Sequence, residues 1–249
     1  MSVPPIQAEG IIDDGLVAFF DVLGYKAIAR SNEVEATGRK VVEVILSLLA
    51  KAQKMGEVPQ VVFEEGCFNH AVFSDSILLY SPVVFPEEHF GNNWFALCCA
   101  SLVTDMFWSG LPVRGAIARG KYYVNRDNRN ICLVGAPIMA AFDVSNRLEI
   151  SACVVTESAR CLFGPRLVFK YSVPVKKKDN EDIVVLEDMV ALNNFICWDG
   201  GVLTQEVVKR QFWEHGKVND CALGKIENTF HFLRDCKARE ELYKEARHD

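Results

Sequence analysis

Apolar and polar residues follow strand and helix periods in turn along the N-terminal part of the chain. Residues 16–22, which are apolar except for Asp21, predict a short buried strand. Gly24 then marks a turn that opens a stretch with helical signals through Arg30. From residue 33 to 55, apolar residues recur at helical spacing with Lys and Glu opposite, which predicts an amphipathic helix closed by Gly56. The chain therefore begins as strand, turn and helix.

The rest of the chain alternates in the same way. β-Branched and aromatic runs predict further strands at residues 61–63, 68–73, 77–80, 112–118, 121–124, 151–156, 167–175 and 183–185. Helical spacing predicts helices at residues 94–108 and 138–148 and in the tail from Thr204 onwards, of which residues 226–245 carry interleaved charges. This pattern predicts one α+β domain, with a core at about residues 16–160 and a C-terminal elaboration, a hairpin plus helices, at about residues 161–249.

Composition narrows the class of protein. The chain has 249 residues, half of them hydrophobic, and a formal net charge of −6. A chain this apolar buries enough surface to fold over most of its length, which argues against disorder, and no apolar run reaches the roughly 18–20 residues of a membrane span. The N-terminus carries no secretion signal, which predicts a cytoplasmic protein. The net negative charge disfavours general binding to nucleic acid or to anionic membranes.

The cysteines and histidines do not indicate a metal centre of the zinc type. The nine cysteines include no Cys-x-x-Cys pair, and several, such as Cys98, Cys132 and Cys153, lie in apolar runs. Buried reduced thiols are the better interpretation. The five histidines are scattered without ligand spacing.

Asp21 is the first candidate for chemistry. It ends an apolar strand immediately before a glycine turn, in the run Phe-Phe-Asp-Val-Leu-Gly-Tyr. At such a junction the carboxylate would stand beside backbone N–H groups that are free to point at an anion, those of Val22, Leu23, Gly24 and Tyr25. The alternative is that Asp21 is a plain helix N-cap.

Asp75 is the second candidate. It lies in the short turn Ser74-Asp75-Ser76 between two apolar strands. If the strands that carry Asp21 and Asp75 are neighbours in one sheet, both carboxylates could share one or two hard, oxygen-ligated ions such as Mg²⁺ or Mn²⁺. The alternative for Asp75 is an ordinary turn residue.

Four motifs in this order resemble the class III nucleotidyl cyclase catalytic domain. Residues 19–25 are similar to the first metal motif of the family, and residues 73–75 to the second, where Gly usually precedes the acid. Residues 113–120 are similar to its Arg-x-Gly-Ile-x-x-Gly strand, and residues 132–135 to the stretch that opens the next helix. The resemblance spans about residues 16–149.

This resemblance implies a fold, an assembly and a reaction. The expected fold is a ferredoxin-like βαββαβ core, and the expected assembly is a head-to-tail homodimer with active sites at its interface. Two Mn²⁺ or Mg²⁺ ions held by Asp21, Asp75 and the Val22 carbonyl would bind a nucleoside triphosphate. The ribose 3′-hydroxyl then attacks the α-phosphorus, pyrophosphate leaves and a 3′,5′-cyclic nucleotide forms.

The chain departs from the family on the helix after residue 135. At the offsets where the family has an Asn and a phosphate-stabilising Arg, this chain has Met139 and Asp143. Asn146 and Arg147 follow one turn later, and Arg147 could substitute if the helix is displaced or longer. Beside Glu149, Arg147 is otherwise simply a charged helix end.

Other cations could contact the substrate phosphates. The candidates are Arg114 on the central strand, Arg119 and Lys121. Arg114 is embedded among apolar residues, where an unpaired charge is costly, so a structural ion pair with a core carboxylate such as Asp105 is the alternative.

The residues expected to read the base differ from those of purine cyclases. The matching positions hold Ala71 and Cys132, and Ala71 offers neither donor nor acceptor. The alternative is that both are core residues.

With these departures, its compact length and its C-terminal tail, the sequence resembles the Pycsar pyrimidine cyclases of bacterial antiphage defence. That resemblance implies conversion of UTP, or alternatively CTP, to cUMP or cCMP, which acts on a separate effector.

Two other classes of function are compatible with the acidic pair. One is a degenerate cyclase-fold module that binds nucleotide without turnover. The other is a metal-dependent phosphodiesterase or nuclease on a palm-like core, which ordinarily has a more basic surface than a net −6 chain offers.

Overall fold

The computed structural model describes most of the chain. The described residues are 10–25, 34–55, 68–82, 84–85, 90–126, 131–197, 202–213 and 220–246. The helical stretch predicted beyond Tyr25 and the strand predicted at residues 61–63 lie outside them. Among the described residues, no helix combines the length and hydropathy needed to cross a lipid bilayer.

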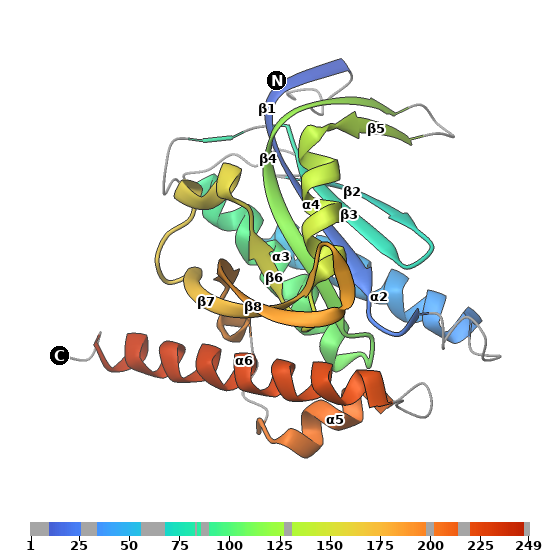
Figure 1. Cartoon of the computed structure of the whole chain (residues 1–249). Coiled ribbons are helices and arrows are strands. Elements are labelled where there is room, and N and C mark those ends of the chain that lie inside the picture. The colour runs from blue at the N-terminus through green and yellow to red at the C-terminus, as the bar shows by residue number, and fades with distance from the viewer. Residues whose placement is uncertain are drawn as a thin grey trace.

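Strands and helices alternate as expected for an α+β chain (Figure 1). The strands are β1 (Gly10–Val22), β2 (Asn69–Phe73), β3 (Ser76–Ser81), β4 (Val113–Arg126), β5 (Ile131–Gly135), β6 (Cys153–Val155), β7 (Val168–Lys177) and β8 (Asn180–Leu192). The helices are α2 (Val34–Met55), α3 (Phe90–Trp108), α4 (Ala136–Arg147), α5 (Gln205–Trp213) and α6 (Asp220–Glu245), with short 3-10 helices η1 (Glu157–Leu162) and η2 (Asn194–Cys197).

One sheet organises the molecule. Its strand order is β2-β3-β1-β4-β6-β8-β7, with β5 paired to the far end of β4. The strands β4, β1, β3 and β2 lie side by side, and with α2 and α3 they form the βαββαβ core of a ferredoxin-like fold. The predicted fold class is confirmed.

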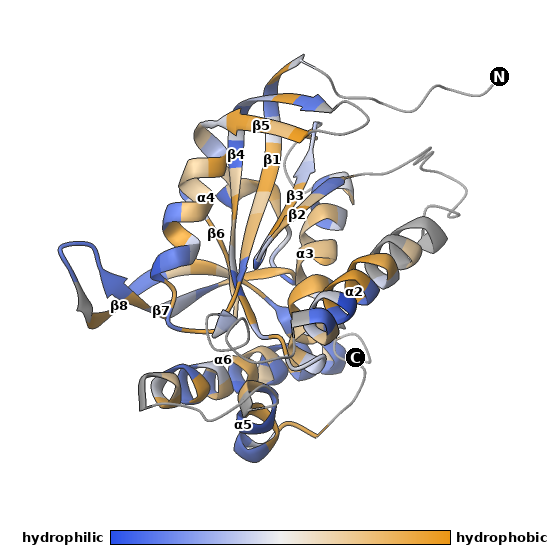
Figure 2. Ribbon diagram, turned by 90° about the vertical axis from the view of Figure 1, so that its right-hand side faces the viewer, coloured by the Kyte–Doolittle hydropathy of each residue, from blue (hydrophilic) through white to orange (hydrophobic). Residues whose placement is uncertain are grey.

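The faces of the sheet carry different helices (Figures 1 and 2). Phe20 and Val22 of β1 pack in one apolar cluster with α2 and α3, whereas Phe19 packs in another with Ala141 of α4. Because side chains alternate along a strand, Asp21 shares the α4 face with Phe19. This alternation decides which helix the candidate carboxylate meets.

The central strand β4 runs further than the sequence predicts. Residues 112–118 and 121–124 were expected to be separate strands divided by Gly120, but β4 continues through that glycine from Val113 to Arg126. Gly115 within it is required by packing, since a Cβ there would lie 2.2 Å from the ring of Phe20. The glycine next to Arg114 therefore lets β4 approach β1 closely.

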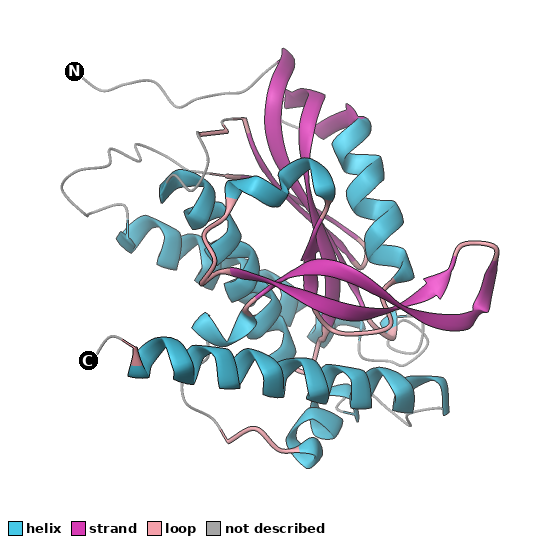
Figure 3. Cartoon of the chain, turned by 60° about the vertical axis from the view of Figure 1, so that its left-hand side comes forward, coloured by secondary structure: helices cyan, strands magenta, loops and turns pink. Residues whose placement is uncertain are grey.

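The C-terminal elaboration extends the sheet and covers one end of it. β7 and β8 form a long, curved hairpin (Figure 3). β8 spans 13 residues, far more than the predicted 183–185. The additional residues pair with β7 and do not form a loop. On β7 the ring of Phe169 stacks on Phe232 of α6 at 5.9 Å. The 3-10 helix η1 was not predicted.

Glu149 joins this elaboration to the core. Its carboxylate is largely buried and lies 3.3 Å from Lys225 of α6 and 3.9 Å from Lys176 of β7. Its carbonyl accepts a hydrogen bond from Asn228 of α6 at 3.0 Å. The residues just after α4 therefore hold both β7 and α6.

The β2–β3 turn carries backbone strain. Phe73 pairs with Ser76, which leaves Ser74 and Asp75 as the two turn residues. Ser74 has φ 57°, the one positive φ among the described non-glycine residues. Glycine takes this conformation without steric cost, so glycine is the residue that this position favours.

We expect Ser74→Gly to raise the free energy of unfolding by about 0.5–1 kcal/mol, because it relieves a left-handed backbone at one residue. For a chain of this size the melting temperature should rise by about 1–4 °C. Gly24→Ala is the matched control, since Gly24 has φ 82° and its substitution should lower the melting temperature. Equal melting temperatures for Ser74→Gly and the wild type would contradict the strain argument.

Candidate functional site

Asp21 lies where three strands meet. It pairs directly with Ser76 of β3 on one side and with Arg114 of β4 on the other. Directly opposed residues of antiparallel strands share a face, so these three side chains stand together on the α4 face. The backbone of the β2–β3 turn is tied to the same point, since the Val22 N–H donates to the Asp75 carbonyl at 3.1 Å.

The carboxyl groups of Asp21 and Asp75 are close enough to interact. Burial raises the pKa of Asp21, the Arg114 guanidinium opposes that rise, and the neighbouring Asp75 carboxyl adds to it. The structure thus brings together the two acids on which the metal hypothesis depends. They are 54 positions apart in the sequence and are brought together by the pairing of β1 with β3 and by the Val22–Asp75 backbone hydrogen bond.

Arg114 is the counter-ion of Asp21. Its Nε and Nη2 both donate to Asp21 Oδ2, at 3.1 and 2.9 Å. Its other donors reach the end of α4, where Nη1 bonds the carbonyls of Asn146 at 2.8 Å and Leu148 at 3.2 Å. Nη2 also bonds Asn146 Oδ1 at 3.3 Å. The side chains of Arg114 and Asp21 are only 14% and 17% exposed, so this is a largely desolvated pair.

The partner of Arg114 is therefore different from the one considered from sequence. Asp105 was the example considered for a structural ion pair, the alternative to phosphate contact, but it lies on α3, where it accepts from Ser101 Oγ at 3.2 Å. Sequence reasoning also missed Asn146 as a structural partner of Arg114. No local signal could have identified it, because the contact depends on where α4 ends relative to β4.

The glycine turn offers fewer free amides than expected. The N–H of Val22 donates to the Asp75 carbonyl, and the N–H of Leu23 donates to the Pro112 carbonyl at 2.8 Å. The prediction that these two amides point at an anion is therefore wrong, because neighbouring strands take them first. Gly24 turns the chain with φ 82°, and Tyr25 packs against the core.

Arg119 and Lys121 lie far along β4 from the acid pair. Arg119 forms an ion pair with Asp14 at 2.6 Å, and Lys121 with Asp13 at 2.7 Å, across the irregular part of β1. Arg119 is five residues from Arg114, or about 17 Å along an extended strand. Within one chain these cations do not meet Asp21.

Ala71 and Cys132, the expected base-reading residues, are also apart. Ala71 lies on β2 at one edge of the sheet, paired with Leu78. Cys132 lies on β5, paired with Asn125 of β4, and its side chain is exposed rather than buried. One copy of the chain does not bring them into a common pocket.

Arg147 is the last residue of α4 and contacts the C-terminal hairpin. Its Nε donates to the Lys176 carbonyl of β7 at 3.0 Å, and its Nη2 pairs with Glu187 of β8. The helix is not extended beyond it. Arg147 is thus a helix-end charge whose partner is Glu187, not Glu149.

The acid pair fits a magnesium-type or manganese-type ion. Its donors are hard carboxylate oxygens, and the raised pKa of Asp21 reflects burial beside a second acid, which a cation would relieve. In the part of the chain that the structure describes, no group of three or more His, Cys, Asp and Glu side chains gathers. Mg²⁺ commonly binds through one or two carboxylates, with substrate phosphates and water completing its shell.

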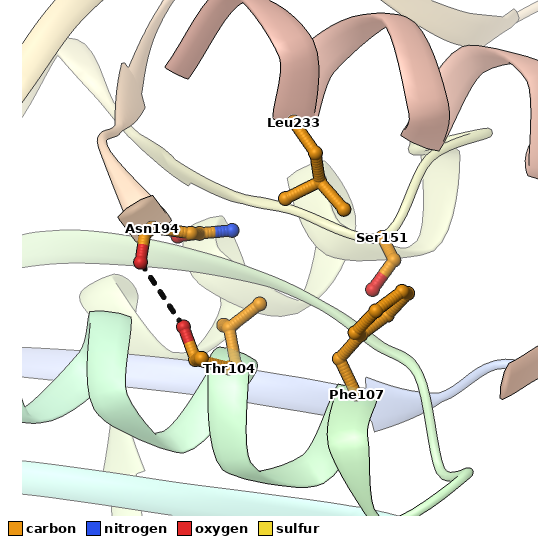
Figure 4. A pocket seen from close by; sticks show the side chains of 6 residues that line it. Thr104, Phe107, Ser151, Asn194 and Leu233 are labelled. Atoms are coloured by element: carbon orange, nitrogen blue, oxygen red, sulfur yellow. Dashed lines mark hydrogen bonds between the residues drawn. The ribbon is translucent and has the colours of Figure 1, made fainter. Parts of the chain in front are cut away.

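Two hollows elsewhere do not include the acid pair. One, of about 10 Å³, lies between α3, η2 and α6 and has room for about one water molecule (Figure 4). There Thr104 donates to the Asn194 carbonyl at 3.1 Å, while the Asn194 side-chain amide has no partner. The other, an open cleft of about 410 Å³ beside α4, contains none of the predicted site residues.

Similarity to known proteins is found in structure and not in sequence. A scan against protein-family models and a search of curated protein sequences both return no match. The structure is similar to the catalytic core of a rhodopsin-guanylyl cyclase with converted specificity, solved with ATPαS, at TM-score 0.52 and 13% identity. That alignment covers 73% of this chain and 96% of the other.

Two further solved structures give the same result. The non-canonical dimeric guanylyl cyclase domain of the RhoGC fusion protein from the aquatic fungus Blastocladiella emersonii aligns at TM-score 0.51 and 14% identity, over 73% of this chain and 96% of that one. An adenylate cyclase from Trypanosoma brucei in its monomeric state aligns at TM-score 0.50 and 12% identity, over 73% and 90%. The fold is therefore that of the class III nucleotidyl cyclase catalytic domain.

The two acids should respond differently to neutralisation. Asp75→Asn removes a like charge beside Asp21, so the metal-free protein should gain about 1 kcal/mol of stability at neutral pH. Asp21→Asn leaves the largely buried Arg114 without its carboxylate and should lose about 2 kcal/mol or more.

Thermal unfolding in the presence of a chelator measures both effects. Asp188→Asn, which alters an exposed carboxylate bonded to Ser172, is the control and should change stability by less than about 0.5 kcal/mol. Equal destabilisation by Asp21→Asn and Asp75→Asn would contradict this account of the site.

Proposed function

We propose that this chain is a metal-dependent nucleotidyl cyclase whose metal ligands are Asp21 and Asp75. The single observation that supports this most is the meeting of the two carboxylates at the end of β1, on a cyclase fold. A pure scaffold has no need of two acids in one partly buried place, where they repel each other. Perturbed carboxyl groups are a common mark of functional sites.

In this proposal the chain positions the reactants. Divalent ions, when bound, would supply the Lewis acidity that favours attack of the ribose 3′-hydroxyl on the α-phosphorus and release of pyrophosphate. Asp21 and Asp75 hold the ions, with the Val22 carbonyl as a further oxygen ligand. The tight strand pairing of β1 with β3 and β4 keeps the two acids in register. Fixed geometry of this kind carries much of the catalysis in phosphoryl transfer.

The proposed assembly is a head-to-tail homodimer with active sites at its interface. Ala71 and Cys132 lie on distant strands of one chain, so a pocket that uses both needs two copies. Arg119, as a substrate-binding residue, would likewise serve the partner's acids. Exposed apolar side chains are available for such an interface, including Phe73 next to the Asp75 turn and Val134, Met139 and Phe142 around α4.

The proposed substrate is a pyrimidine nucleotide, UTP in preference to CTP, and the proposed role is second-messenger production in antiphage defence. Support comes from Ala71, whose methyl group cannot exchange hydrogen bonds with a purine edge. The cyclic nucleotide would act on a separate effector, which need not contact this chain.

A degenerate module that binds nucleotide without turnover is the second candidate. One observation favours it: Met139 and Asp143 stand where the catalytic Asn and Arg are expected, and Arg147 is already engaged by Glu187. The two acids favour the enzyme, and the assay below separates the alternatives.

Incubation with each of the four labelled NTPs and Mn²⁺, with products resolved by chromatography, tests the proposal. We expect a cyclic pyrimidine nucleotide plus pyrophosphate, lost on chelation of the metal. Asp21→Asn and Asp75→Asn should each reduce the rate by at least about 100-fold, since each removes a metal ligand. Asp188→Asn should retain the wild-type rate.

The other outcomes are equally informative. Metal-dependent thermal stabilisation by an NTP without product would identify a binding module. Full activity in both acid variants would overturn the metal assignment, and cleavage of nucleic acid would favour the phosphodiesterase class.

A further inference from the structure

We propose that Arg114 is a positioning residue, which fixes the Asp21 carboxylate and the end of α4 relative to each other and does not contact substrate phosphates. This proposal rests on the proposed function, in which Asp21 is a metal ligand. It replaces the expectation that Arg114 is a catalytic phosphate-binding residue.

The donor inventory of Arg114 carries the argument. A guanidinium has five N–H donors in a rigid planar fork and no acceptor. All five are matched by acceptors of the chain itself: Nε and one Nη2 proton by Asp21, the second Nη2 proton by Asn146 Oδ1, and both Nη1 protons by the carbonyls of Asn146 and Leu148. A phosphate could be bound only by giving up one of these bonds in a largely buried place.

The fork orients the candidate metal ligand. Both of its bonds to Asp21 go to Oδ2, which leaves Oδ1 for an ion shared with Asp75. A carboxylate held at one oxygen cannot rotate freely, so its other oxygen is pre-positioned. Residues that orient metal ligands in this way affect metal affinity strongly in other metalloproteins.

The same fork fixes the end of α4. The carbonyls of Asn146 and Leu148 flank Arg147, whose side chain reaches the Lys176 carbonyl and Glu187 on the hairpin. Immediately afterwards the Glu149 N–H donates to the Pro174 carbonyl at 2.9 Å. The Arg114 side chain thus links Asp21, the candidate metal ligand on β1, to the segment that leads from α4 into the C-terminal elaboration.

The test compares Arg114→Gln and Arg114→Lys by Mn²⁺ titration of the nucleotide-free protein, with free Mn²⁺ followed by EPR. Positioning predicts weaker Mn²⁺ binding in both variants, by about 10-fold or more, because neither side chain reproduces the fork. Simple electrostatics predicts the opposite for Arg114→Gln, since removal of a nearby cation should tighten Mn²⁺ binding. A phosphate contact predicts unchanged Mn²⁺ binding, with only the KM or kcat for the NTP affected.

Controls and a second readout keep the outcomes separate. Arg166→Gln removes an arginine–carboxylate pair with Glu240, remote from the acids, and should bind Mn²⁺ as the wild type does. Hydrogen exchange of the Leu148 and Glu149 amides should accelerate at least about 10-fold in Arg114→Lys and remain unchanged in Arg166→Gln.

Unchanged or tighter Mn²⁺ binding in both Arg114 variants would overturn the proposal, as would unchanged exchange at the end of α4. A wild-type protein that binds no Mn²⁺ would instead contradict the proposed function. The role of Arg114 would then be judged by the exchange measurement alone.

Discussion

The structure depends on keeping two acidic side chains side by side at one end of the sheet. Partly buried carboxylates repel each other, and burial itself disfavours their charge. The molecule offsets part of these costs with one arginine, which lies directly across the strand pair from Asp21 and is matched at every donor, while the pKa of Asp21 stays raised. That arrangement requires β1 and β4 to approach closely, which is why Gly115 stands beneath the ring of Phe20. The strand register, the position of Gly115 and the Asp21–Arg114 ion pair therefore depend on one another.

Much of the core could be predicted from local pattern. The apolar run before Asp21 and the helical spacing at residues 34–55 specify their elements without help from the rest of the chain. The meeting of Asp21 with Asp75 was also within reach, because a ferredoxin-like order makes their strands neighbours. These features depend on periodicity and on short-range turn chemistry, which a sequence displays directly.

Other features depend on contacts that a sequence does not display. The partner of Arg114 is set by the register of β1 against β4, and the length of β8 by pairing with a strand that has its own apolar pattern. The amides of Val22 and Leu23 looked free because nothing local shows that Asp75 and Pro112 carbonyls arrive beside them. The conformation of Ser74 is likewise imposed by the two-residue turn rather than chosen by serine.

The end of the sheet formed by β7 has a consequence for how the protein behaves at high concentration. An outermost strand with unpaired backbone groups is a template for aggregation. On the outer edge of β7, Pro174 has no N–H to donate, and its carbonyl already accepts a hydrogen bond from the Glu149 N–H. Lys170 and Lys177 on the same strand add positive charge that disfavours pairing with a second copy of β7. Edge-to-edge pairing of β7 strands from two molecules is therefore disfavoured, so ordered self-association would use other surfaces.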